Sequence, residues 1–83
     1  MLEKVFFELI CFAKWQLVEA YEDQVTIQSG DRQLFDLETE EWMPAPATTI
    51  RLYRNNRYQI LSGNHLSFYE REVLELGKYQ KVK

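Results

Sequence analysis

The first segment of the chain has hydrophobic residues at helical spacing. On a helix with about 100° per residue, this segment has one apolar face, made of Leu2, Phe6, Leu9, Ile10, Ala13 and Leu17. Phe7, Cys11 and Trp15 form a second apolar stripe at a spacing of four residues. As a strand, the segment would leave neither face polar, and strands of this length without Gly or Pro are uncommon. The pattern therefore favours a helix over 2–14 whose second stripe needs a partner.

Short apolar segments separated by turn residues follow from Trp15 onward. Segments 17–21 and 25–28 flank a polar turn, which predicts a hairpin. Residues 34–42 resemble one hairpin of a kelch or other propeller blade. This resemblance covers only nine residues, so it implies a hairpin and no more. Two prolines in segment 43–47 favour extended backbone, and we expect this segment to connect two halves of one sheet.

The second half of the chain begins with another predicted hairpin. Segments 48–54 and 57–61 are joined by two asparagines at 55–56, which tolerate the left-handed backbone of a tight turn. In that register Tyr53 would face Tyr58 as a cross-strand aromatic pair.

The last segment is compatible with two structures. Ser67 and Glu70 have the spacing of a capping box, and Gly77 stands where a helix would stop. A helix of about nine residues fits these signals. Segments 65–69 and 73–76 fit one more hairpin equally well.

These elements predict an α+β fold that is mostly β. We expect an N-terminal helix packed on a small antiparallel β meander or barrel-like sheet, with an all-β fold as the alternative. The 83 residues have room for one core, so we expect a single domain over 1–83. The rings and aliphatic side chains between Trp15 and Leu61 should then point inward.

The net charge of −3 conceals an uneven distribution. Residues 1–46 hold three basic and ten acidic side chains, whereas residues 47–83 hold seven basic and three acidic ones. Opposite charge on the two halves suits attraction within one fold, which we favour, or attraction to a partner.

Cysteine usage and the N-terminal segment bear on the compartment. The single cysteine, Cys11, cannot form an intramolecular disulfide, and its neighbours Ile10 and Phe12 predict a buried thiol. This suits a reducing compartment. Charged residues interrupt the apolar N-terminal segment, so we expect no signal peptide, no membrane span and no membrane partner. The expected location is the cytoplasm.

The chain offers few groups for catalysis. His65 is its only histidine and Cys11 its only thiol, which falls short of the four ligands of a structural zinc site. Its three glycines stand too far apart for a phosphate loop. The acidic cluster of residues 36–41 lies in a predicted turn open to water, unlike the carboxylates of a hydrolase. We therefore expect a protein that is not an enzyme, with no catalytic residue, metal, cofactor or small-molecule substrate.

The first functional hypothesis is a small non-enzymatic protein-interaction or regulatory module. Its basis is the excess of apolar surface on segment 2–18 together with the opposite charge of the two halves, which would suit self-association or docking to a larger partner. The candidate interface consists of Phe7, Cys11 and Trp15. The partner would be another protein or a second copy of the chain in a homodimer.

The alternative is a module that binds single-stranded nucleic acid through hairpin 51–58. Arginine recognises phosphate with a planar fork, and tyrosine rings stack on bases. The candidate binding residues are Arg51, Tyr53, Arg54, Arg57 and Tyr58. In the expected register Arg54 would face Arg57, an unfavourable pair of like charges that a phosphate would relieve. The negative net charge of the chain ranks nucleic acid below a protein partner.

Overall fold

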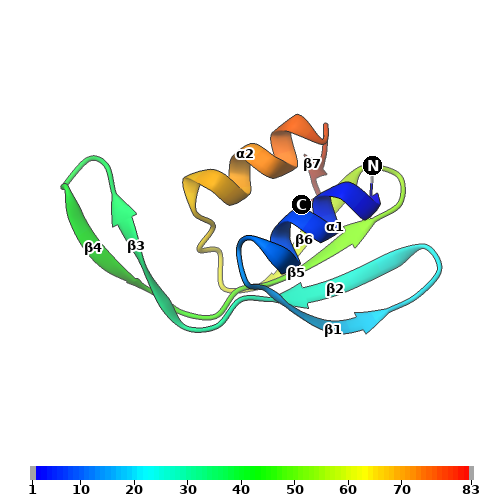
Figure 1. The fold of residues 1–83 in the computed structure, drawn as a ribbon, viewed down its shortest axis with the longest axis horizontal. Coiled ribbons are helices and arrows are strands. Elements are labelled where there is room, and N and C mark those ends of the chain that lie inside the picture. The colour runs from blue at the N-terminus through cyan, green and yellow to red at the C-terminus, as the bar shows by residue number, and fades with distance from the viewer. Residues whose placement is uncertain (1, 83) are drawn as a thin grey trace.

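The computed structural model describes residues 2–82, which contain two helices and seven strands (Figure 1). In chain order they are α1 (Leu2–Cys11), β1 (Gln16–Ala20), β2 (Gln24–Gln28), β3 (Arg32–Asp36), β4 (Glu41–Ala45), β5 (Thr49–Tyr53), β6 (Arg57–Ser62), α2 (Phe68–Leu76) and β7 (Gln80–Lys81). The predicted mostly β fold with an N-terminal helix is confirmed, and of the two structures considered for the last segment the helix is the one that forms.

Five of the strands form one sheet in the order β1-β2-β5-β6-β7. Its neighbours are antiparallel except β6 and β7, which run parallel. Strands β3 and β4 form a separate two-stranded sheet. This hairpin, which we call the arm, projects away from the rest of the molecule (Figure 1). The sheets are open and do not close into a barrel.

The arm is an insertion between two strands that pair with each other, since β2 is bonded directly to β5. The proline-containing segment was expected to connect two halves of one sheet. Its first part instead completes β4, where Pro44 lies opposite Gln33, and its end leads from the arm back to the main sheet. Proline fits here because β4 belongs to a two-stranded sheet, so one side of the strand needs no N–H for pairing.

The hydrophobic core lies between the five-stranded sheet and the two helices. Its buried members are Val5, Leu9, Trp15, Ile27, Ile50, Leu52, Leu66, Val73, Leu74 and Tyr79. Ile27 is the cross-strand partner of Ile50, so both point to the helix side, whereas the neighbouring pair Thr26 and Arg51 points to the opposite face. The sheet therefore has one apolar face covered by helices and one polar face open to solvent.

Helix α2 begins at the capping box that the sequence indicated. The Ser67 hydroxyl accepts a hydrogen bond from the Glu70 N–H at 3.2 Å, and the Glu70 carboxylate accepts one from the Ser67 N–H at 2.8 Å. At the other end, the N–H of Gly77 donates to the Val73 carbonyl. These bonds satisfy backbone groups at the helix ends, which favours the helix over the alternative hairpin.

The hairpin between β5 and β6 differs from the predicted register by one residue. Tyr53 pairs with Arg57, and Leu52 pairs with Tyr58. The prediction assumed a turn of two residues, but only Asn56 takes a positive φ, of 63°, and the loop has three residues. A three-residue loop of this kind ends in a residue with left-handed backbone. The change places Tyr53 and Tyr58 on opposite faces of the sheet.

The expectation that the rings and aliphatic side chains between Trp15 and Leu61 point inward is wrong for a large group of them. The exposed members are Leu17, Val18, Tyr21, Phe35, Leu37, Trp42, Met43 and Leu61. Four of them, Phe35, Leu37, Trp42 and Met43, belong to the arm. A two-stranded sheet there has no second layer to cover both of its faces.

The three residues of the predicted interface stripe do not lie on one exposed surface. Phe7 and Cys11 are exposed, so the expectation of a buried thiol is wrong. Trp15 is only 2% exposed and belongs to the core. The helix ends at Cys11, and Lys14 takes a positive φ of 66°, so Trp15 leaves the helical register that the stripe assumed.

Candidate functional site

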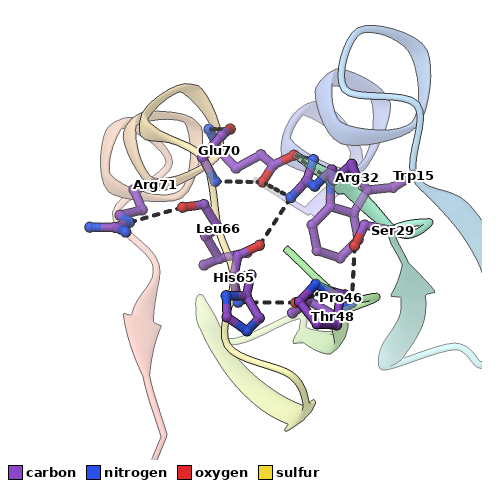
Figure 2. Close-up of polar contacts among 10 residues, drawn as sticks. Trp15, Ser29, Arg32, Pro46, Thr48, His65, Leu66, Glu70 and Arg71 are labelled. Carbon is purple, nitrogen blue, oxygen red and sulfur yellow. Dashed lines mark hydrogen bonds and ion pairs between the residues drawn. The ribbon is translucent and has the colours of Figure 1, made fainter. Parts of the chain in front are cut away.

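A buried carboxylate holds the base of the arm. Glu70, which is 1% exposed, lies in the first turn of α2. Its oxygens accept hydrogen bonds from Trp15 Nε1 at 2.6 Å and from both terminal nitrogens of Arg32 at 2.5 Å (Figure 2). Arg32 is the first residue of β3. The bidentate pair therefore ties the first strand of the arm to α2, and the indole N–H adds the segment that follows α1.

Arg32 makes further contacts at this point. Its Nη2 donates to the backbone carbonyl of His65 at 3.0 Å. Its guanidinium carbon lies 5.5 Å from the centroid of a Trp15 ring, within the range of a cation–π contact. One side chain thus joins the arm, the loop before α2 and the core.

A second group of hydrogen bonds fixes the loop before α2. Thr48 Oγ1 accepts from the N–H of His65 at 3.0 Å. The N–H of Thr48 donates to Ser29 Oγ at 3.0 Å, and the N–H of Ser29 donates to the Thr48 carbonyl at 2.9 Å (Figure 2). His65 takes part through its backbone, and its side chain is exposed. These bonds hold both connections of the arm and the start of α2 in one place.

Two opposing influences set the pKa of Glu70. Burial raises this pKa, while the hydrogen bonds from Arg32, Trp15 and Ser67, together with the charge of Arg32, lower it. The balance lies below the ordinary value of 4.5. The carboxyl is therefore ionised in the folded protein wherever an ordinary glutamate is.

This lowered pKa predicts an acid-sensitive component of stability. The unfolded chain takes up the proton first, so the stabilisation is complete above the ordinary pKa of 4.5 and is lost as the pH falls through the folded-state pKa. Urea unfolding from pH 7 to pH 3 measures it. The reference is the double variant Arg32→Met with Glu70→Gln, which lacks this titration. We expect the wild-type free energy of unfolding to fall more steeply below pH 4.5, whereas parallel curves would rule out this role.

A groove of ≈ 830 Å³ lies between the arm and α2. Its arm wall includes Leu34, Phe35, Leu37, Trp42 and Met43, and its opposite wall includes His65, Leu66, Phe68, Tyr69 and Arg71. Phe35 is 45% exposed, Trp42 65% and Phe68 72%. Both walls thus present large apolar side chains to solvent, and grouped exposure of this kind marks binding surfaces.

Apolar residues occupy both faces of the arm. Phe35 lies opposite Trp42, and their rings meet edge to face at 5.4 Å between centroids. On the other face Leu34 lies opposite Met43. A two-stranded hairpin is marginally stable by itself in water, so further packing on either face would stabilise it.

The five residues predicted to bind nucleic acid are not brought onto one surface. Arg51, Tyr53 and Arg57 share the open face of the main sheet. Tyr58 points to the helix-covered face. Arg54 lies in the hairpin loop and donates twice to a backbone carbonyl of the β1–β2 turn, at 3.0 and 2.8 Å.

Two of the three side chains that do share the open face bond to their neighbours there. Arg51 donates to Thr26 Oγ1 at 3.1 Å and lies 3.6 Å from the carboxylate of Glu19. The Tyr53 hydroxyl donates to Gln59 at 3.1 Å. These contacts engage the groups that a nucleic acid would use.

A second exposed aromatic pair lies outside the groove. Phe7 on α1 and Phe12 just after it meet edge to face with their centroids 6.2 Å apart. Both side chains are more than half exposed. This pair and the exposed Cys11 are what remains of the predicted interface stripe.

The groove itself was missed in the sequence. The sequence indicated both the hairpin and the capped helix that form its walls. However, the alternation of apolar residues along a strand does not show whether another element covers the faces of the hairpin. The available signal was the pairing of neighbouring large apolar residues, at 34–35 and again at 42–43. Such pairs give a hairpin two apolar faces.

Comparison of the chain with protein-family models, with curated proteins and with solved structures finds no match. Over the side chains that the structure describes, no group of three or more His, Cys, Asp or Glu residues could hold a metal ion. None of the helices within residues 2–82 is long and apolar enough to cross a membrane.

Proposed function

We propose that this chain is a small non-enzymatic protein-interaction module and that its partner binds in the groove between the arm and α2. The observation that carries this proposal is a groove whose lining includes three exposed aromatic side chains, Phe35 and Trp42 of the arm and Phe68 of α2. Aromatic side chains are enriched at protein interfaces and contribute much of their binding energy.

The anchoring of the arm supports the proposal. Both walls of the groove begin at the same buried contact, because Arg32 starts the arm and Glu70 lies in the first turn of α2. Binding surfaces held on fixed elements lose less conformational entropy when a partner binds. The buried pair therefore sets the spacing of the walls.

Binding of single-stranded nucleic acid is the second candidate. It is favoured by the placement of Arg51, Tyr53 and Arg57 on one open sheet face. It ranks lower because Glu19 carries negative charge onto that face and the chain has a net charge of −3.

Affinity capture from an extract of the native cells tests the protein-binding proposal. The test variant is Phe35→Ala with Phe68→Ala, which removes one ring from each wall. The matched control is Phe7→Ala with Phe12→Ala, which removes the exposed pair outside the groove. We expect the amount of the specific partner captured by the test variant to be lower than that captured by the wild type by about tenfold or more. The reason is that aromatic side chains buried at an interface contribute much of its binding energy. The control should retain it fully.

Quantitative mass spectrometry of the retained proteins is the readout, and circular dichroism establishes that both variants fold. The same proteins retained by both variants at wild-type levels would contradict the groove as the binding surface. Loss confined to the control variant would move the interface to α1.

A further inference from the structure

The arm wall of the groove is strongly acidic. Its turn carries Asp36, Glu38, Glu40 and Glu41, and the first two line the groove. From residue 33 to residue 50 the sequence contains no Lys or Arg. The carboxylates therefore stand beside the exposed apolar side chains of the arm with no cation in the same stretch of chain.

The turn keeps these carboxylates in a defined arrangement. Asp36 Oδ1 accepts from the N–H of Glu38 at 2.9 Å, and the Asp36 carbonyl accepts from the N–H of Glu40 at 2.7 Å. Glu40 takes a positive φ of 56°. The side chains of Glu38, Glu40 and Glu41 remain exposed. The turn thus presents three solvated carboxylates at the end of the arm.

The rest of the molecule does not neutralise this charge. Among the described residues, ion pairs join Glu70 to Arg32 and Glu19 to Arg51, and neither involves the turn of the arm. On the opposite wall of the groove, the Arg71 Nε donates to a backbone carbonyl of its own segment, that of Leu66, at 3.3 Å. Within residues 4–82, the carboxylates of the arm turn therefore have no ion-pair partner, and they are open to a cation of another molecule.

We infer that the groove takes a basic segment of a partner protein, one in which Lys or Arg residues flank an apolar anchor. This inference rests on the proposed function and adds the chemistry of the partner. The anchor would lie in the groove that Trp42 and Phe68 help to line, and the cations would bind the carboxylates of the arm turn. A cation over the exposed Trp42 ring would gain a cation–π contact. Complementary charge of this kind speeds association and selects among partners.

A second copy of the chain is disfavoured as the occupant by the same charges. Packing two arms on each other would bring their carboxylates together, and the chain has a net charge of −3. Like charges across an interface weaken association.

Selection from a displayed library of random dodecapeptides on the full chain tests the inference. We expect the enriched peptides to contain Lys or Arg on either side of an aromatic or aliphatic residue. Calorimetric titration of one such synthetic peptide then compares two matched variants. Glu38→Gln with Glu40→Gln and Glu41→Gln removes three carboxylates from the arm, and we expect it to weaken binding by about tenfold at low salt.

The control variant, Glu22→Gln with Asp23→Asn and Glu75→Gln, removes three carboxylates outside the groove and should bind as the wild type does. Equal weakening by both triple variants would overturn the inference, because it would show a general effect of net charge.

The library and its controls separate the two proposals. Enrichment of neutral or acidic peptides that Phe35→Ala with Phe68→Ala abolishes would keep the groove as a binding site and overturn the basic partner. A homodimer in sedimentation equilibrium that this variant dissociates would also keep the groove as a binding site, but its occupant would be a second copy of the chain and not a basic partner.

Two other results would overturn both proposals. One is a set of peptides that bind this variant as well as they bind the wild type. Binding of a single-stranded oligonucleotide in place of peptides, lost on Arg51→Ala with Arg57→Ala, would also overturn both.

Discussion

Replacement of Glu70 by alanine is expected to lower the free energy of unfolding by about 3–5 kcal/mol, the usual effect of breaking a buried ion pair from one side. The change leaves the Arg32 guanidinium and the Trp15 indole N–H without the acceptor that they share. A small domain has only about 5–15 kcal/mol of stability in total, so this loss takes a large share of it. Urea unfolding followed by circular dichroism measures the change.

Two further variants separate the loss of the ion pair from a general effect of replacing a glutamate in α2. Glu72→Ala alters an exposed glutamate of the same helix and should change the free energy of unfolding by less than about 0.5 kcal/mol. Arg32→Met with Glu70→Leu removes both charges, and we expect it to recover most of the loss, because buried ion pairs can be replaced by apolar side chains. A Glu70→Ala variant as stable as Glu72→Ala would show that the pair does not hold the arm.

The second large effect is expected at Gly63, in the loop between β6 and α2. This residue has a positive φ of 80°, and an added Cβ would lie 2.5 Å from Thr48 Oγ1 and 2.7 Å from the Ala47 carbonyl oxygen. Gly63→Ala would therefore combine backbone strain with a collision against main-chain atoms. We expect a loss of about 3 kcal/mol.

Gly30→Ala is the matched control, because no heavy atom lies within 4 Å of the Cβ that it would add. Its effect should be within about 0.5 kcal/mol of zero. Thermal unfolding of the two variants gives the comparison. Similar melting temperatures for both would show that the loop does not pack on Thr48 as described.

The regular elements could be predicted because their signals are local. The helical spacing near the N-terminus, the hairpin turn before β2 and the capping box of Ser67 and Glu70 each lie within a few residues. Such signals can be read without the rest of the chain, although the last segment fitted a helix and a hairpin equally well. The same reasoning found the three hairpins but placed the one between β5 and β6 in the wrong register, since an Asn-Asn pair does not show which asparagine takes the left-handed backbone.

The pairing between elements could not be predicted in this way. Strand β2 pairs with β5 across the inserted arm, and the parallel strand β7 has only two residues, too few to carry a pattern. Glu70 was recognised as half of a capping box, but its bonds to Arg32 and Trp15 span 38 and 55 residues. No sequence spacing marks contacts of that length.

The candidate site was the least accessible from sequence. The N-terminal stripe assumed that Trp15 continues the helix, whereas the chain turns at Lys14 and Trp15 enters the core. The arm was expected to bury its rings, and the absence of a second layer exposes them. The acidic turn was interpreted as a solvated loop, which it is, but its position beside Phe35 and Trp42 is what supports the proposed basic partner.

Mapping the bound partner by NMR tests the central claim most directly. Amide shifts of the labelled full chain would be followed while a protein retained in the capture experiment is added. The groove predicts that the largest changes fall on residues 34–43 and 64–71. Changes centred on Phe7 and Phe12, or on the open sheet face around Arg51, with the arm and the start of α2 unaffected, would contradict it.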